Sequence, residues 1–213
     1  MTESILNDNE EYIIKCDKDG NIIGPISKIH AHSPGVRQNQ THYSTWSMIF
    51  HAESGRYGIQ LKNPRKHDEF GAGKWDMGAA GHNCYVKNKD GYRPMDFKET
   101  LIKEVDEEIG LDVDVIDSVN EFIKKSKTRI EKPIAIIFEK FHYKTERNNE
   151  FVGLAFILTP TKNTDFKDDE VVDFKWLTPE EIKKYLKESN DYCDALPLVF
   201  EKAEKFRKKY ISK

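Results

Sequence analysis

Three glutamates close together are the feature of this sequence with the clearest chemical potential. Glu104, Glu107 and Glu108 lie in the segment ETLIKEVDEEIGL (99–111), with Asp106 beside them. Side chains three or four positions apart share one face of a helix, so the three glutamates are expected to point the same way. Three carboxylates in one patch suit Mg²⁺ or Mn²⁺, which take oxygen ligands. The alternative is a solvated acidic face, because charge runs are common on helix surfaces.

A helix from about residue 96 to 109 must hold these glutamates. Its apolar residues recur every four positions and predict a buried stripe: Phe97, Leu101, Val105 and Ile109. Asp96 is placed as an N-cap with Glu99 three residues later, a spacing typical of a capping box. Gly110 is placed to end the helix.

The remaining elements predict a mixed sheet. Hairpins are expected at 11–27, around Asp19-Gly20, and at 42–62. Strands are expected at 133–143, 150–159 and 171–177, and later helices at 178 onward and 194–210. Segments 28–41, 63–74 and 87–94 have loop chemistry. The fold class predicted is α/β (α+β), with a mixed β-sheet sandwiched between helices.

Composition restricts the function classes. A chain of 213 residues with 38% hydrophobic residues suits one domain with its own core. A net charge of −3 argues against general nucleic-acid binding. No apolar run approaches the ~20 residues that span a bilayer, and the first residues lack a signal-peptide pattern. Three scattered cysteines give no zinc signature and fit a reducing compartment, so the cytoplasm is expected.

The helix and the residues before it resemble the Nudix signature, in which Gly and Glu precede Arg-Glu-apolar-x-Glu-Glu-x-Gly-apolar. Residues 103–111 fit the second half, with Lys103 in place of Arg. The first half fits from Gly81 once the insertion KNKDGYRP (87–94) is set aside, with Met95 in place of Glu. The resemblance implies that Glu104, Glu107 and Glu108 are metal ligands and that Gly81, Lys103 and Gly110 are motif or structural positions.

The two departures from the signature affect one matched pair. The resemblance implies that the Glu and Arg brace the loop against the helix. Because both members differ here, the ion pair of the signature is lost as a whole. Lys103 has Glu99 or Asp96 as an alternative partner.

The flanking residues resemble the isopentenyl-diphosphate isomerase-like branch of the Nudix hydrolases. The matching segments are His42–Trp46, Gly73–Asp76, Ala80–His82, Asn149-Glu150 and 170–181. The resemblance covers about residues 11–185. It implies a single Nudix domain over 1–213, comprising an N-terminal hairpin and loop (1–40), the Nudix core (41–185) and a C-terminal helix (186–213).

Isomerase chemistry is disfavoured at two positions. In the isomerases a Cys before the Gly-His pair acts as the acid or base, and here that position is Ala80. A second metal-binding Glu of the isomerases is replaced by Asn148. Because alanine cannot transfer a proton, a diphosphate hydrolase on the same scaffold is the better prediction. Cys84 does not match the catalytic position and is interpreted as a structural thiol.

The resemblance adds three candidate metal ligands. His42, His82 and Glu150 match ligand positions of the isomerases, and imidazole ligands favour Mn²⁺ over Mg²⁺. A hydrogen-bonded core or surface role is the alternative for each histidine. Four further histidines have no such support and are interpreted as surface residues: His30, His32, His67 and His142.

Substrate phosphates need cations, and four basic residues crowd the loop before Trp75. They are Lys62, Arg65, Lys66 and Lys74. The resemblance implies that basic residues here contact the diphosphate, whereas the alternative is that they are simply solvated. The insertion 87–94 is a candidate lid or specificity loop.

The function predicted is metal-dependent cleavage of a phosphoanhydride bond in a nucleoside diphosphate-type or related organic diphosphate, with Mg²⁺ or Mn²⁺ as cofactor. Glu104 or Glu150 is the predicted general base. An isopentenyl-diphosphate isomerase-like enzyme and a non-catalytic diphosphate-binding module remain as alternatives. The expected partner is a small-molecule diphosphate, without nucleic acid or membrane, and a homodimer is left open.

Overall fold

The computed structural model describes residues 6–7, 9–65 and 71–211. Their packing divides the chain into two compact units. Unit 1 comprises Met1–Thr45, Gly81–Thr100 and Glu139–Gly153, and unit 2 comprises Trp46–Ala80, Leu101–Phe138 and Leu154–Lys213. The assignment of residues 1–213 to a single domain stays a prediction.

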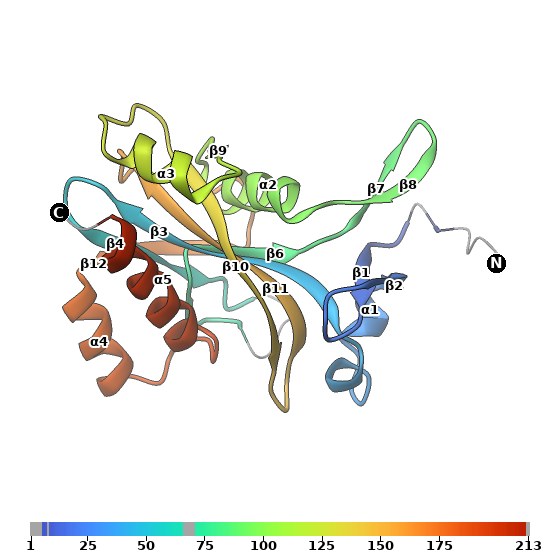
Figure 1. The fold of residues 1–213 in the computed structure, drawn as a ribbon. Helices are drawn as coiled ribbons and strands as arrows, with labels where there is room; N and C mark the ends of the chain where they lie inside the picture. The colour runs from blue at the N-terminus through green and yellow to red at the C-terminus, as the bar shows by residue number, and fades with distance from the viewer. Residues whose placement is uncertain (1–5, 8, 66–70, 212–213) are drawn as a thin grey trace. The chain divides into compact units, whose positions relative to one another are not determined.

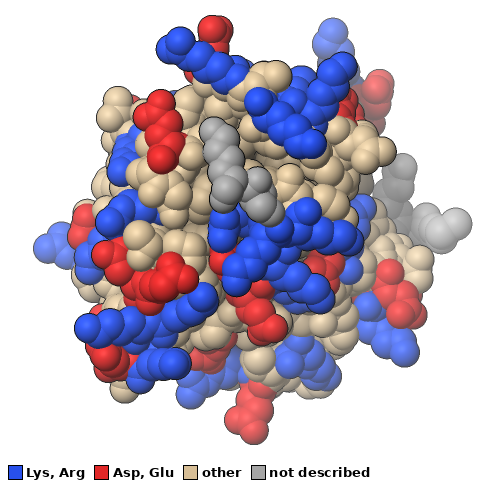
Figure 2. All heavy atoms as spheres, turned by 60° about the vertical axis from the view of Figure 1, so that its left-hand side comes forward, with Lys and Arg blue, Asp and Glu red and all other residues tan. Residues whose placement is uncertain are grey.

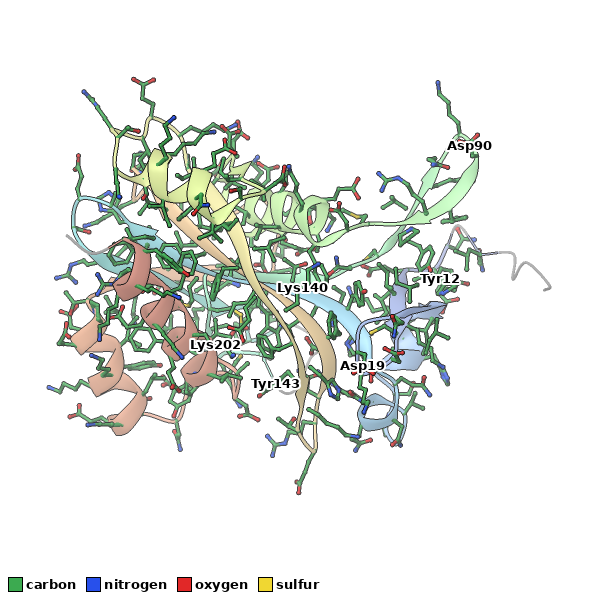
Figure 3. The ribbon with its side chains drawn as sticks, viewed as in Figure 1. Tyr12, Asp19, Asp90, Lys140, Tyr143 and Lys202 are labelled. Atoms are coloured by element: carbon green, nitrogen blue, oxygen red, sulfur yellow. The ribbon has the colours of Figure 1, made fainter. Side chains whose placement is uncertain are left out.

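Two short hairpins lie within the described residues of unit 1, in addition to the turn between the strands that begin at Ile134 and Asn149. Strands β1 (Tyr12–Cys16) and β2 (Ile22–Ser27) pair antiparallel, which confirms the hairpin expected at 11–27. Gly20 in their turn has φ +82°, a conformation that favours glycine. The insertion expected to be a loop instead forms strands β7 (Tyr85–Asn88) and β8 (Gly91–Pro94). Figure 3 marks Asp90 in the turn that joins these two strands.

The segment 28–41, expected to be a loop, contains two short helices. Helix α1 (Lys28–Ala31) begins at Ser27, whose side chain accepts a hydrogen bond from the His30 amide. The 3₁₀ helix η1 covers Arg37–Asn39. These turns place His32 on an ordered segment rather than in an open loop.

The main sheet is mixed and has the strand order β12-β4-β3-β11-β10-β9. Its strands are β3 (His42–His51), β4 (Arg56–Lys62), β9 (Asp114–Val115), β10 (Ile134–Lys144), β11 (Asn149–Thr159) and β12 (Val171–Leu177). Strands β5 (Trp75–Asp76) and β6 (Ala79–His82) pair with β4 and β3. Strands β9 and β10 are parallel, whereas β12, β4 and β3 are antiparallel neighbours. The strands expected at 42–62, 133–143, 150–159 and 171–177 are therefore confirmed.

Helix α2 (Phe97–Ile109) covers one face of this sheet with its buried stripe. Leu101, Val105 and Ile109 pack in one core cluster with sheet residues that include Ile49 and Ile157. The predicted capping box begins the helix: the Glu99 amide donates to Asp96 Oδ1 at 2.8 Å, and the Asp96 amide donates to Glu99 Oε2 at 3.0 Å. The helix is therefore held at both its start and its buried face.

An aromatic cluster fills the opposite face of the same sheet. Tyr57, Phe156 and Phe206 are among its members, with ring centroids of Phe156 and Phe206 5.4 Å apart. Helix α5 (Leu196–Tyr210) supplies Phe206, and Phe122 of α3 (Val119–Ser126) contacts it. Helix α4 is Pro179–Glu188. Figure 1 shows α2 and α5 on opposite sides of the strands, so the sheet lies between helices as the fold class predicts.

Charged side chains of both signs are mixed across the face drawn in Figure 2. Such mixing agrees with the small net charge of −3. Among the described residues, none of the helices combines the length and the apolar character that crossing a membrane requires.

Candidate functional site

The three glutamates of α2 share one face of the helix but differ in exposure. The Glu108 side chain is fully buried, the Glu104 side chain is 13% exposed and the Glu107 side chain is 44% exposed. All three lie in unit 2. The patch therefore extends from the sheet surface to the solvent.

Glu108 is held by donors from three directions. It forms an ion pair with Lys62, and Glu108 Oε2 accepts from Gln60 Nε2 at 3.1 Å and from the Ala80 amide at 2.9 Å. Burial disfavours the Lys62 ammonium, but Glu108 and Asp76 outweigh burial and raise the pKa of Lys62 above its ordinary value. The structure thus places Lys62, predicted to contact substrate, in a buried pair that joins β4 to α2.

Lys103 bridges the other two glutamates. Lys103 Nζ lies 3.1 Å from Glu104 Oε1 and 2.7 Å from Glu107 Oε2. The alternative partner Glu99 instead binds both terminal nitrogens of Arg93, at 2.8 and 2.6 Å. Burial raises the pKa of Glu104 to about 7; Lys103 opposes this shift, and the neighbouring glutamates add to it.

Gly110 ends α2 as the sequence predicts, with φ +69°. A Cβ at this position would lie 2.5 Å from the carbonyl oxygen of Asp165, so the close approach of the 165–167 segment requires glycine. The Asp165 and Lys167 amides donate to the carbonyl oxygens of Ile109 and Glu107, each at 3.0 Å. This segment therefore satisfies carbonyls in the last turn and fixes the backbone that carries Glu107.

Three histidines gather within unit 1. Each of His32, His42 and His82 offers a ring nitrogen, and these atoms lie within 4.8 Å of one another. His32 Nε2 and His82 Nε2 are 3.2 Å apart. The interpretation of His32 as a surface residue is wrong, since it is half-buried in this cluster.

The histidine cluster favours neutral imidazoles. Burial lowers the pKa of His42 to about 4 and places the pKa of His82 well below the ordinary value. Burial also lowers the pKa of His32. His42 Nδ1 lies 3.1 Å from the carbonyl oxygen of Gln40, whereas its Nε2 has no hydrogen-bond partner among the described residues. A neutral imidazole with a free nitrogen is the form that binds metal ions.

Glu150 lies in unit 1 on β11 and is buried. The hydroxyl of Ser44 donates to its carboxylate. Burial raises the pKa of Glu150, while the hydrogen bond from Ser44 and the nearby side chains of Arg37 and His32 oppose the shift. The adjacent Asn149 donates from Nδ2 to the Gln38 carbonyl oxygen at 2.8 Å and so ties β11 to the segment before β3.

The remaining candidate residues are distributed along the loop and strands. Arg65 is exposed, Lys74 is half-buried and Gly81 lies in β6. Lys66 lies outside the described residues. The sequence reasoning missed His32 and Gln60, because the contacts of His32 with His82 and of Gln60 with Glu108 join residues 50 and 48 positions apart. A local sequence pattern cannot predict contacts between residues so far apart in the chain.

No family model matches this sequence, and no curated protein matches it. Solved structures do match. The DR0079 protein from Deinococcus radiodurans has a TM-score of 0.59 at 14% identity, over 94% of this chain and 99% of that chain. A MutT protein from Methanosarcina mazei has a TM-score of 0.50 at 16% identity, over 78% and 94%. A NUDIX hydrolase from Nitrosomonas europaea has a TM-score of 0.50 at 15% identity, over 80% and 90%.

This chain has the Nudix fold. The expected mixed sheet between helices is confirmed. At these low sequence identities the similarity shows the fold alone. Assignment to the isopentenyl-diphosphate isomerase-like branch stays a prediction.

Proposed function

We propose that this chain is a metal-dependent Nudix hydrolase that cleaves the diphosphate linkage of a nucleoside diphosphate-type or related organic diphosphate. The observation that carries the proposal is the set of carboxylates of Glu104, Glu107 and Glu108 on one face of α2, within the Nudix fold. A site outside catalysis has little reason to concentrate this much negative charge beside its core.

The donor sets of the two units fit divalent metals. The α2 carboxylates offer hard oxygen ligands for Mg²⁺ or Mn²⁺. In unit 1, the unpartnered Nε2 of His42 beside His32 and His82 fits a metal that accepts nitrogen ligands, such as Mn²⁺, and Glu150 is proposed as a further ligand. Bound metal would neutralise phosphate charge and lower the pKa of an attacking water.

Glu104 is the first candidate for the general base. In the metal-free chain, burial raises the pKa of Glu104 to about 7, close to neutral pH, and this partly exposed carboxylate is proposed to take a proton from water during attack on phosphorus and to release that proton afterwards. Glu150, buried with a raised pKa, is the second candidate. Arg65, Lys66 and Lys74 are proposed to bind the diphosphate.

Lys62 is the fourth proposed substrate contact, and its position makes its role indirect. Its ammonium is committed to Glu108, so it supports the site by holding that carboxylate. The positive charge that contacts the substrate is then proposed to come from Arg65, Lys66 and Lys74, which follow β4.

Two alternatives keep specific support. An isomerase-like enzyme is favoured by the His42 and His82 pair and disfavoured by Ala80, which cannot transfer a proton. A non-catalytic diphosphate-binding module is favoured by the engagement of all three α2 carboxylates with lysines.

The test is phosphate or nucleotide release from a panel of nucleoside diphosphates, nucleoside triphosphates, dinucleotides and prenyl diphosphates, with Mg²⁺ and Mn²⁺ compared. We expect turnover of at least one member, and we expect Glu104→Gln to reduce kcat by about 10²–10⁴-fold with the fold intact. Near-wild-type turnover by Glu104→Gln would contradict the role of Glu104. Tight binding of a diphosphate without release under either metal would favour the binding module.

A further inference from the structure

The acidic patch of α2 carries its own counter-cations. Lys103 Nζ lies between Glu104 Oε1 and Glu107 Oε2, at 3.1 and 2.7 Å, and Lys62 is paired with Glu108. The like charges on this helix face are therefore compensated by two lysine side chains of the chain itself. Any divalent cation that binds here must compete with an ammonium group that already occupies its ligands.

The two lysines differ in how easily they can leave. The Lys103 side chain is 42% exposed and lies on the solvent edge of the patch. Its ammonium group can therefore rotate toward the solvent and be hydrated there. The Lys62 side chain is only 7% exposed, and its partner Glu108 is fully buried. Moving Lys62 away would leave a buried carboxylate without its charge partner.

We propose that Lys103 is a displaceable counter-cation that competes with the divalent metal for Glu104 and Glu107 and so sets the metal affinity of the site, whereas Lys62 remains on Glu108. The inference rests on the proposed function, because it takes the α2 carboxylates as the metal ligands. It assigns Lys103 a positioning and competing role, separate from contact with substrate or reacting atoms.

The chemistry of the exchange follows from charge. Glu104 and Glu107 interact more strongly with a divalent cation than with the single charge of the Lys103 ammonium. Once the metal is bound, repulsion between the two cations drives the flexible Lys103 side chain outward. Replacing Lys103 by methionine removes the competitor and keeps a side chain of similar length.

Titration calorimetry with Mg²⁺ on the full chain tests the proposal, at a pH above the pKa of Glu104. Mg²⁺ is chosen because it prefers oxygen ligands and so reports on the carboxylates rather than on the histidine cluster. We expect Lys103→Met to bind Mg²⁺ about three- to tenfold more tightly than the wild type. We expect Lys103→Arg, which keeps the charge, to bind Mg²⁺ with nearly wild-type affinity.

Lys124→Met is the matched control, because Lys124 is an exposed lysine on α3 outside the patch. It should leave the Mg²⁺ affinity unchanged. Thermal unfolding with and without Mg²⁺ gives a second readout, in which the Mg²⁺-induced rise in Tm should be larger for Lys103→Met than for the wild type.

The outcomes separate this inference from the proposed function. If Glu104→Gln abolishes Mg²⁺ binding but Lys103→Met leaves the affinity unchanged or weaker, the role of Lys103 is overturned and the proposed function stands. If Glu104→Gln binds Mg²⁺ as well as the wild type, or if no variant binds it, the α2 carboxylates are not the ligands and both proposals are overturned.

Discussion

The buried pair of Lys62 and Glu108 gives a prediction about single residues. Lys62→Met leaves Glu108 charged and buried without its partner, so we expect a loss of about 3–5 kcal/mol in the free energy of unfolding. Adding Glu108→Gln removes the stranded charge, and the double variant should recover most of that loss. Urea unfolding of the two single variants and the double variant measures the coupling.

Lys124→Met again serves as the control for removing a lysine charge from the surface, and it should change the unfolding free energy by less than about 0.5 kcal/mol. A Lys62→Met variant as stable as this control would show that the buried pair contributes little.

Residue spacing predicted which glutamates share a face, since helical periodicity is local. It did not predict their counter-cations. Glu99 and Asp96 were alternative partners for Lys103, and the sequence did not decide between them. In the structure Lys103 binds Glu104 and Glu107, and Glu99 binds Arg93. Side chains of similar reach compete for the same partner, and only the positions of the neighbouring elements decide between them.

At the scale of elements, Glu99 links the β7–β8 hairpin to the start of α2. It accepts from the Asp96 amide as part of the capping box and also binds Arg93 of β8. We expect Glu99→Ala to reduce the free energy of unfolding by about 1 kcal/mol, because it loses both contacts. Urea unfolding followed by circular dichroism measures the change.

Glu99→Gln separates the two roles of this side chain. Glutamine still accepts from the Asp96 amide but loses the charge that pairs with Arg93, and the exposed ion pair contributes little. Glu99→Gln should therefore lie closer to the wild type than to Glu99→Ala. Equal losses in the two variants would mean that the ion pair, not the cap, stabilises this end of α2.

The attachment of α5 to β4 gives a pH-dependent prediction. Burial works to raise the pKa of Glu204, but Arg207, at 2.8 and 2.9 Å, and the Tyr57 hydroxyl, at 2.9 Å, outweigh it and lower that pKa. The folded chain thus holds this proton less tightly than the unfolded chain. Glu204 therefore contributes stability above its unfolded pKa of about 4.3, and that stability is lost as pH falls through the lower folded pKa.

Unfolding experiments with Glu204→Gln across acidic pH test this account. The variant should be less stable than the wild type near neutral pH, and the difference should shrink below about pH 4. A difference that stays constant or grows as the pH falls would contradict the assigned direction of the pKa shift.

Long elements with strong periodicity were predicted well, whereas several of the short ones were not. The α2 stripe and the strands at 133–143 and 150–159 carry enough residues to define their pattern. The hairpin β7–β8 was expected to be a loop, because its turn chemistry outweighs four-residue strands. Strand β9 has only two residues, and its pairing with β10 joins distant parts of the chain.

At the scale of the whole molecule, the fold is preserved where sequence identity is low. Structures at 14–16% identity cover 78–94% of this chain, while no family model matches it. A fold depends on which positions are buried, and many apolar residues satisfy that requirement. The fold was predictable because Gly81 and the glutamates of α2 have the spacing of the Nudix signature once the insertion 87–94 is set aside.

The central claim is that water attacks phosphorus, and the most direct test is to find which product takes up oxygen from the solvent. The wild-type chain would be incubated with the best substrate of the diphosphate panel and metal in heavy-oxygen water, and the products examined by mass spectrometry. Attack of water on phosphorus predicts one solvent oxygen in a phosphate product, and Glu104→Gln should lose this labelling together with turnover. Exchange of solvent hydrogen into the carbon skeleton of a prenyl diphosphate, without label on phosphorus or phosphate release, would contradict hydrolysis and support the isomerase-like alternative.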